Sequence, residues 1–181
     1  MIAIMSALAD ALAPHLTHEL VAEAGSTLFH QGDRVDHLYV VRSGCVHLVR
    51  YGEDGAAAVM QRATPGAVLA ESSIFSEAYH CDAAVIEDAS LGRADVSRLR
   101  EAMRSDTDLL EAVTRHLARE VHQMRSRLEL LSRRTVKERL DGWLALNEGV
   151  LPPHGSWRAL ADYIGVSPEA FYRELKRRRA S

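Results

Sequence analysis

The spacing of apolar residues divides the chain into regions of different periodicity. Residues 2–20 have helical spacing and predict a short helical lead-in, whereas residues 23–94 contain short apolar runs separated by glycine turns such as Ser43-Gly44 and Pro65-Gly66. Many short strands at regular spacing with glycine turns favour a β-barrel or jelly roll. The expected strands are residues 27–29, 38–41, 46–49, 57–61, 83–86 and 90–92.

From residue 95 onward, apolar residues recur every three or four positions, which predicts helices. A short helix is expected at 95–103, and Ser105 or Asp106 can cap a much longer helix that follows it. Another amphipathic helix is expected at 136–146, and two short helices meet at residues 165–167. The pattern therefore predicts an α+β chain with its strands first and its helices last.

The long predicted helix has a narrow apolar stripe whose members alternate at three- and four-residue spacing. This a/d seam extends over three heptads, and Thr114 occupies the one weak position. A helix packed on its own domain is the alternative, but charged residues cover the other faces, which favours a two-stranded coiled coil. We therefore predict a homodimer interface formed by Leu110, Leu117, Val121, Met124, Leu128 and Leu131.

The last two predicted helices form a helix-turn-helix pattern. Gly165 permits a sharp turn, Ser167 can cap the second helix, and Pro168 suits its first position. Phe171 and Leu175 give this helix a buried side, and such a helix is typical of one that enters the DNA major groove. An ordinary helical hairpin with a basic, solvated end is the alternative. The predicted DNA-binding residues are Ser167, Glu169, Tyr172, Arg173, Lys176 and Arg177.

Charge is distributed unevenly along the chain. Residues 132–181 contain ten Lys and Arg against six Asp and Glu, a net charge of +4, whereas the whole chain carries −3, which leaves −7 on residues 1–131. A basic terminal region beside an acidic body favours DNA contact localised to that region. The alternative is a ligand-binding or scaffold module whose basic helical domain contacts protein.

The composition excludes several classes of protein. With 47% hydrophobic and 26% charged residues and no apolar run of membrane-spanning length, the chain is expected to be a soluble protein without a membrane partner. It has no secretory signal pattern, and Cys45 and Cys81 form no CxxC pair, so a cytoplasmic location is expected. The nine histidines are scattered and no HExxH, GxSxG or P-loop motif is present, so no enzymatic activity is expected.

The predicted roll, long helix and helix-turn-helix, in this order, resemble the Crp–Fnr superfamily of bacterial transcription regulators. The marks of the resemblance are residues 28–33 (LFHQGD), residues 38–44 (LYVVRSG), Pro65-Gly66 leading to Glu71, and residues 165–173. The resemblance implies homodimerisation, promoter DNA and RNA polymerase as partners, and a long helix that moves with the sensory roll and re-aims the DNA-binding domains. The implied domains are a cyclic-nucleotide-binding-like sensory roll at 1–104, a dimerisation helix at 105–131 and a helix-turn-helix domain at 132–181, with little or no wing after the recognition helix.

The same resemblance places Ser167, Glu169 and Arg173 on the base-reading face. This agrees with their chemistry, because Arg pairs bidentately with guanine and Glu accepts from the cytosine amino group. Pro168 stands where several family members have a basic or polar residue, which leaves the DNA sequence recognised undetermined. The basic residues 176–179 are expected to contact phosphates.

The resemblance also implies an effector pocket. Family members that bind cyclic nucleotides use a Gly-Glu turn for the ribose and, ten residues later, an Arg for the cyclic phosphate; here Ala70-Glu71 and Cys81 occupy these positions. A neutral thiol beside a carboxylate supplies no cation, so cyclic AMP is not expected to be the effector. The expected pocket residues are Glu71, Ser72, His80, Cys81 and Asp82.

The resemblance also bears on which cofactors the chain could hold. The cysteine cluster that holds an iron–sulfur centre in some family members is missing from the N-terminal segment, so no such centre is expected. Haem, metal or redox sensing through His80 and Cys81 stays open. The alternative is that Cys81 is a small buried apolar residue.

Overall fold

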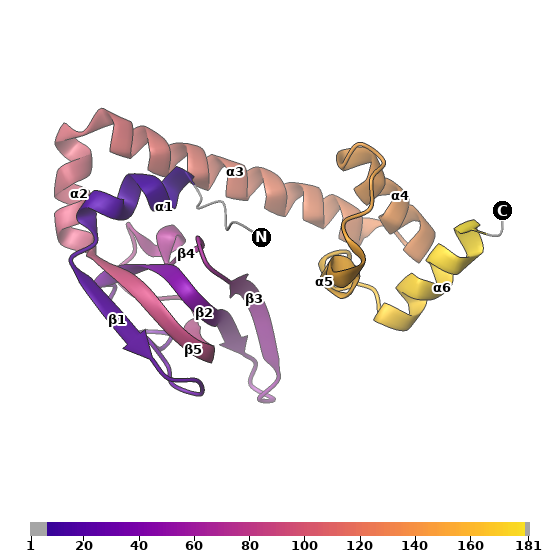
Figure 1. The fold of residues 1–181 in the computed structure, drawn as a ribbon, viewed down its shortest axis with the longest axis horizontal. Helices are drawn as coiled ribbons and strands as arrows, with labels where there is room; N and C mark the ends of the chain where they lie inside the picture. The colour runs from indigo at the N-terminus through magenta and orange to yellow at the C-terminus, as the bar shows by residue number, and fades with distance from the viewer. Residues whose placement is uncertain (1–6, 180–181) are drawn as a thin grey trace. The chain divides into compact units, whose positions relative to one another are not determined.

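The computed structural model describes residues 7–179, and the chain divides into two compact units, residues 1–117 and residues 118–181. The boundary between them falls within one continuous helix, α3 (Thr107–Ser132) (Figure 1). The expected division into a roll, a separate dimerisation helix and a helix-turn-helix domain stays a prediction. The ends of the predicted lead-in and of the C-terminal domain, residues 1–6 and 180–181, lie outside the described residues.

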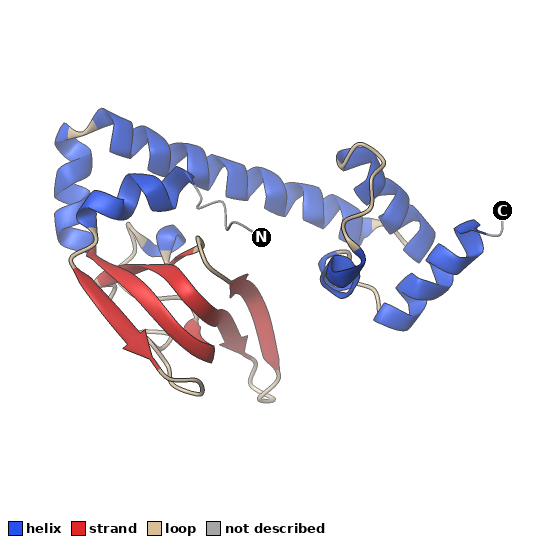
Figure 2. Cartoon of the chain, in the orientation of Figure 1, coloured by secondary structure: helices blue, strands red, loops and turns tan. Residues whose placement is uncertain are grey.

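The first unit is built on a five-stranded antiparallel sheet. Its strand order is β1-β5-β2-β3, and β4 pairs with β2. This sheet and the helices that accompany it fit the predicted α+β jelly roll (Figure 2). The elements before α3 are α1 (Ala7–Leu12), a 3-10 turn (Ala13–His15), β1 (His18–Ala22), β2 (His37–Tyr51), β3 (Ala57–Ala63), β4 (Val68–Leu69), a second 3-10 turn (Glu71–Ser73), β5 (Asp82–Asp95) and α2 (Val96–Ser105).

The turn predicted at Ser43-Gly44 is wrong, because one strand runs through it. Residues 38–41 and 46–49 belong to the single strand β2, whose pairing with β5 shifts register around Ser43 and Cys45. Gly44 lies at this irregularity with φ +80°, and an added Cβ would lie 2.2 Å from the Asp88 carbonyl oxygen. Glycine therefore lets β2 bend without leaving the sheet, as in a β-bulge.

The start of the first unit also differs from the prediction. Helical structure ends at His15, and β1 follows at His18–Ala22. Among the described residues, β1 pairs only with β5 and is mostly exposed, so it lacks the apolar alternation that identifies a half-buried strand. At 27–29 only Thr27 forms a bridge, to Ala84, while the buried ring of Phe29 stacks on Tyr79 with a centroid distance of 3.8 Å.

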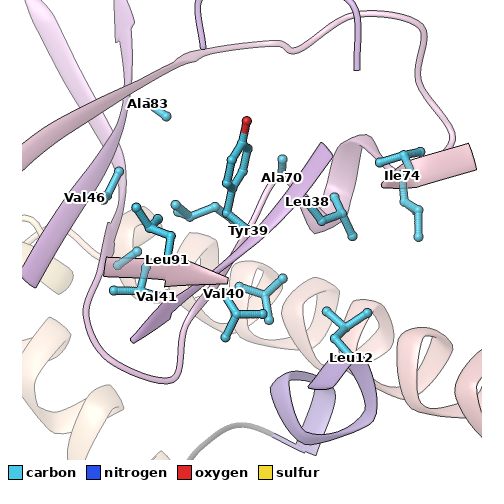
Figure 3. Packing of buried hydrophobic residues seen from close by; sticks show 14 of the residues in the cluster. Leu12, Leu38, Tyr39, Val40, Val41, Val46, Ala70, Ile74, Ala83 and Leu91 are labelled. Carbon is cyan, nitrogen blue, oxygen red and sulfur yellow. The ribbon is translucent and has the colours of Figure 1, made fainter. Parts of the chain in front are cut away.

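One hydrophobic core joins the helices to the sheet in the first unit. Leu12 of α1, Leu38 of β2 and Leu91 of β5 lie in this core (Figure 3). Leu109 and Val113, from the first turns of α3, are buried in the same core. α2 was expected at 95–103 and begins one residue later, because Asp95 caps it by accepting a hydrogen bond from the Arg98 amide.

The second unit consists of the end of α3 and the helices that follow it. These are α4 (Val136–Leu146), a 3-10 turn (His154–Ser156), α5 (Trp157–Tyr163) and α6 (Pro168–Arg179). The predicted bounds of α4 are confirmed, and a capping box between Thr135 and Glu138 begins the helix. Within residues 7–179, no helix is both long and apolar enough to cross a membrane. The core of this unit is Leu130, Leu140, Leu160, Ala161, Ile164, Phe171 and Leu175.

Candidate nucleic-acid interface and effector pocket

A tight turn joins α5 to α6 where the sequence predicted it. Gly165 has φ +66°, and the amide of Val166 donates to the Ala161 carbonyl at 3.0 Å. The Ser167 hydroxyl accepts a hydrogen bond from the Ala170 amide at 3.2 Å and so caps α6, which begins at Pro168. Local hydrogen bonds therefore fix the point at which α6 leaves the turn.

Gly165 is needed for packing as well as for its backbone conformation. A Cβ added at this position would lie 2.6 Å from Cδ2 of Leu131 and 3.2 Å from Nη1 of Arg139. Real Cβ atoms do not approach neighbours as closely as 2.6 Å, so the end of the Leu131 side chain would have to move to admit a larger residue.

The outer face of α6 carries the residues that were predicted to read DNA bases. Glu169, Tyr172 and Arg173 are exposed, while Phe171 and Leu175 are buried on the opposite face. Hydrogen bonds from the Glu169 backbone amide and from the Ser167 hydroxyl hold the pKa of the Glu169 carboxyl below its ordinary value. Glu169 is therefore an ionised acceptor at neutral pH, next to the Arg173 donor one turn along the same face.

The basic residues at the end of α6 fall into two groups. Within residues 7–179, neither Arg173 nor Lys176 forms an ion pair or hydrogen bond through its side chain. Arg177 instead donates from Nε and Nη2 to Glu174, both at 2.9 Å, and Arg178 donates to Glu174 at 2.8 Å. The predicted phosphate contact of Arg177 thus competes with an internal ion pair.

Sequence reasoning missed Glu174, which is only 8% exposed. The hydrogen bonds from Arg177 and then Arg178 hold the pKa of its carboxyl below the ordinary value. Arg178 also pairs with Asp141 of α4 at 2.7 Å, so it ties α6 to α4 instead of pointing outward. The i,i+3 and i,i+4 spacing of Glu174 with the two arginines is a signal that could have identified this network.

Most of the predicted dimer seam on α3 is uncovered in the single chain. Val121, Met124 and Leu128 are 44%, 56% and 65% exposed, and Leu110 is 42% exposed. Leu130, on another face of the helix, is only 1% exposed and belongs to the core of the second unit. The apolar positions of α3 therefore form two sets, one buried within the chain and one left exposed.

The two remaining seam residues are partly buried. Leu117 packs against the core of the first unit, and Leu131 lies next to Gly165, as the short Cβ distance above indicates. These two side chains contact their own chain, which is what the alternative interpretation expects of the whole stripe. Val121, Met124 and Leu128, which lie between them, are exposed, and their burial in a dimer stays a prediction.

Of the positions predicted for the effector pocket, Glu71 and Asp82 lie close enough to Cys81 to affect the pKa of its thiol. Burial raises the pKa of the Cys81 thiol; Arg50 acts in the opposite direction, and the carboxylates of Asp82 and Glu71 add to the rise. Cys81 is 2% exposed, so it is a neutral, buried thiol. Ser72, in contrast, is exposed in the 3-10 turn that follows Ala70, whose φ is +67°.

Other groups of this pocket are already hydrogen-bonded. His80 Nδ1 lies 3.1 Å from the Ser73 hydroxyl, and Asp82 accepts a hydrogen bond from the Gln31 amide at 2.6 Å. Within residues 7–179, no group of three or more His, Cys, Asp and Glu side chains could hold a metal ion. The predicted His80 and Cys81 pair therefore does not form part of a metal-ligand set there.

One cation beside Cys81, Arg50, was not predicted from the sequence. Arg50 of β2 donates from Nε and Nη2 to the His80 carbonyl, at 3.2 Å and 2.9 Å. The antiparallel register that pairs Val49 with Asp82 brings Arg50 near, although it is distant in sequence. Because its guanidinium is bound to backbone and its neighbours are a neutral thiol and carboxylates, this donor set does not fit a cyclic phosphate.

Comparison with known proteins identifies the first unit. Residues 19–106 match the family model of the cyclic nucleotide-binding domain. Transcriptional activator protein Anr of Pseudomonas protegens is 27% identical over 163 residues, which cover 84% of this chain and 67% of the relative. Nitrogen fixation regulation protein FixK of Bradyrhizobium diazoefficiens is 27% identical over 170 residues, covering 88% of this chain and 70% of the relative.

Solved structures show the same fold. FixK2 from Bradyrhizobium japonicum superposes with a TM-score of 0.66 at 22% identity, covering 90% of this chain and 84% of that one. The N-terminal domain of a transcriptional regulator from Streptomyces coelicolor superposes with a TM-score of 0.53 at 25% identity, covering 68% of this chain and 85% of that one. The chain therefore has a cyclic nucleotide-binding-like domain, and its relatives are transcription regulators of the Crp–Fnr family.

Proposed function

We propose that this chain, a relative of the Crp–Fnr regulators, is a sequence-specific DNA-binding transcription regulator and not an enzyme. The observation that carries the proposal is the exposed face of α6, where Glu169 and Arg173 lie one turn apart on a helix whose start is fixed by Gly165 and Ser167. Glu169 can accept from a cytosine amino group and Arg173 can donate to guanine. Promoter DNA is the proposed partner, together with the RNA polymerase that a regulator of transcription acts on.

The regulator acts as a homodimer in this proposal. The exposed stripe of Leu110, Val121, Met124 and Leu128 supports an interface along α3, because these apolar side chains are 42–65% exposed against the part of the chain that the structure describes. A two-fold dimer presents two copies of α6, which fits a near-palindromic site with half-sites about one helical turn apart.

The effector proposed for this protein is not cyclic AMP. The buried thiol of Cys81, the neighbouring carboxylates and the engaged guanidinium of Arg50 offer a cyclic phosphate no available cation. Isothermal titration calorimetry tests this directly: we expect no tight cyclic AMP binding, and a tight, saturable signal would contradict the proposal. Redox sensing through Cys81 has little support, because a buried neutral thiol reacts slowly.

DNA binding can be tested by selecting sites from a randomised duplex library and measuring affinity by fluorescence anisotropy across salt concentrations. We expect Arg173→Ala to weaken binding to the selected DNA far more than binding to random DNA, because base contacts determine sequence specificity and phosphate contacts do not. Arg115→Ala is the matched control, since it removes the same charge from an exposed position on α3.

The same titration includes the outcome that would overturn the proposal. Affinity that is indifferent to DNA sequence, or to Arg173→Ala, would favour a scaffold module whose basic domain contacts protein. In that case the salt dependence would also lack the steep slope that counterion release from DNA produces.

A further inference from the structure

The carbonyl groups at the end of α5 are bound by two arginines that the proposed DNA contacts do not include. Arg127 of α3 donates from Nε to the Tyr163 carbonyl at 3.0 Å. Arg139 of α4 donates from Nη1 to the next two carbonyls, those of Ile164 at 3.2 Å and Gly165 at 2.7 Å. Three consecutive carbonyls before α6 therefore accept hydrogen bonds from cationic donors.

The guanidinium of Arg139 also reaches the end of α3. Its Nη2 donates to the Leu131 carbonyl at 3.1 Å, and its Nε donates to the Arg133 carbonyl at 2.9 Å. One planar group thus connects the last turn of α3 with the turn that precedes α6. Lysine could not reproduce this geometry, because its single ammonium cannot donate along four directions fixed in one plane.

Elementary helix chemistry explains why arginines occupy these positions. The last carbonyls of an α-helix have no partner within the helix, and they carry the negative end of the helix dipole. α3 and α5 both end beside Arg139, so one charge satisfies carbonyls from two helix ends. The contact is specific, because charge-assisted hydrogen bonds with a fixed fork constrain direction as well as distance.

Packing reinforces the same connection. The Arg127 guanidinium lies 5.4 Å from the centroid of the Tyr163 ring, within cation–π range. Cδ2 of Leu131 lies so close to Gly165 that a Cβ there would displace the end of the leucine side chain. The end of α3, the turn and the start of α6 are therefore held as one packed assembly within the second unit.

We propose that Arg127 and Arg139 are positioning residues that fix the direction of α6 relative to the end of α3. This inference rests on the proposed DNA-binding function and dimer. In a dimer joined along α3, the two arginines of each protomer set the separation and tilt of the two α6 helices. They therefore set which half-site spacing the protein accepts, without contacting DNA.

A spacing assay tests this inference on the full-length protein. Duplexes carry two copies of the selected half-site at the preferred spacing and at one base pair more or less. We expect the wild type to bind the preferred spacing at least about tenfold more tightly than the altered ones, since one base pair rotates the half-sites by roughly a tenth of a turn. In Arg139→Gln we expect this preference to fall to about threefold or less, with single half-site affinity nearly unchanged.

Salt dependence separates positioning from direct phosphate contact. Removing a phosphate contact lowers, by roughly 1, the magnitude of the slope of log affinity against the logarithm of the salt concentration. We expect Arg139→Gln to leave the slope unchanged, and the matched control Lys176→Gln, on the exposed face of α6, to lower it. A reduced slope in Arg139→Gln with its spacing preference intact would overturn the inference and make Arg139 a phosphate contact.

A second variant covers the case in which Arg139→Gln does not fold, as judged by thermal unfolding and circular dichroism. Arg127→Gln removes one carbonyl contact and leaves the four hydrogen bonds of Arg139 in place. We expect a smaller loss of spacing preference in the same direction. Wild-type spacing preference in this folded variant would overturn the inference.

An orientation measurement that needs no DNA distinguishes failure of the inference from failure of the proposed function. A spin label is attached at Lys176→Cys, and Cys45→Ser removes the more accessible native thiol. The labels then report the distance between the two α6 helices of a dimer. Arg139→Gln is expected to broaden a narrow wild-type distribution. An unchanged distribution would contradict the inference even if DNA binding fails, and the absence of any inter-protomer distance would contradict the dimer on which it rests.

Discussion

Truncating Leu128 to Ala is predicted to weaken dimerisation strongly while leaving each folded protomer almost unchanged. Leu128 is 65% exposed in the single chain, so the proposed interface is the environment in which its side chain can be buried. Full burial of a leucine side chain contributes roughly 1.5–3 kcal/mol. The exposed part of Leu128 therefore contributes about 1–2 kcal/mol per protomer, when the partner covers it.

A two-fold interface buries this side chain twice. The substitution therefore weakens the free energy of dimerisation by about 2–4 kcal/mol per dimer, which corresponds to a roughly 30- to 700-fold increase in the dissociation constant. The stability of the isolated protomer should change by no more than about 0.5 kcal/mol, because the substitution lies on its surface. Sedimentation velocity over a dilution series measures the first quantity, and urea unfolding at the lowest concentrations measures the second.

Leu146→Ala is the matched control, because Leu146 is 53% exposed but lies on α4, outside the seam. We expect it to leave the dissociation constant within about twofold of the wild type. Equal weakening by the two substitutions would refute the assignment of the interface to the seam. A wild type that is monomeric at micromolar concentration would refute the dimer itself.

Three further predictions concern other parts of the chain. Gly44→Ala should lower the free energy of unfolding by more than the roughly 1–2 kcal/mol that a left-handed alanine costs, since its Cβ would lie 2.2 Å from a carbonyl oxygen. Gly25→Ala is the control, because Gly25 has φ +85° and an added Cβ there would meet no atom within 4 Å. In urea unfolding it should show the conformational cost alone. The lowered pKa of Glu174 means that its ion pair stabilises the fold above the ordinary value of 4.5 and is lost as pH falls below it. Glu174→Gln should therefore flatten the decrease in unfolding free energy on acidification, and a slope equal to that of the wild type would contradict this. The buried Cys81 thiol, with its raised pKa, should react with a thiol reagent only after unfolding, and rapid labelling in the native protein at pH 7 would revive redox sensing.

Features that depend on neighbours in sequence were predictable. Asp106 caps α3 by accepting from the Leu109 amide at 2.9 Å, as one of the two residues proposed for that role. Gly165 and Ser167 form the predicted turn and cap. These predictions are correct because a cap or a tight turn involves residues only three or four positions apart. A left-handed backbone conformation also favours glycine, so a glycine in the sequence indicates such a position.

Features that depend on distant partners were not predictable. Gly44 looked like a turn because glycine permits both a turn and a bulge, and only pairing with β5 shows that β2 continues. Arg50 approaches Cys81 through strand register, and Arg139 binds the carbonyls of Ile164 and Gly165, which any residue type could supply. No sequence pattern marks an arginine whose partners are backbone atoms.

α3 shows how one helix can satisfy several requirements at once, and why the sequence alone gave an incomplete description of it. Leu130 is buried in its own chain while Leu128, two positions earlier, is exposed, because residues two apart point to different faces of a helix. Leu131 belongs to the predicted seam and also packs beside Gly165. A seam residue that touches the turn would give the proposed dimer interface a direct physical route to α6, so a change in how two copies of α3 pack in that dimer would also change the support of the turn that Arg139 binds.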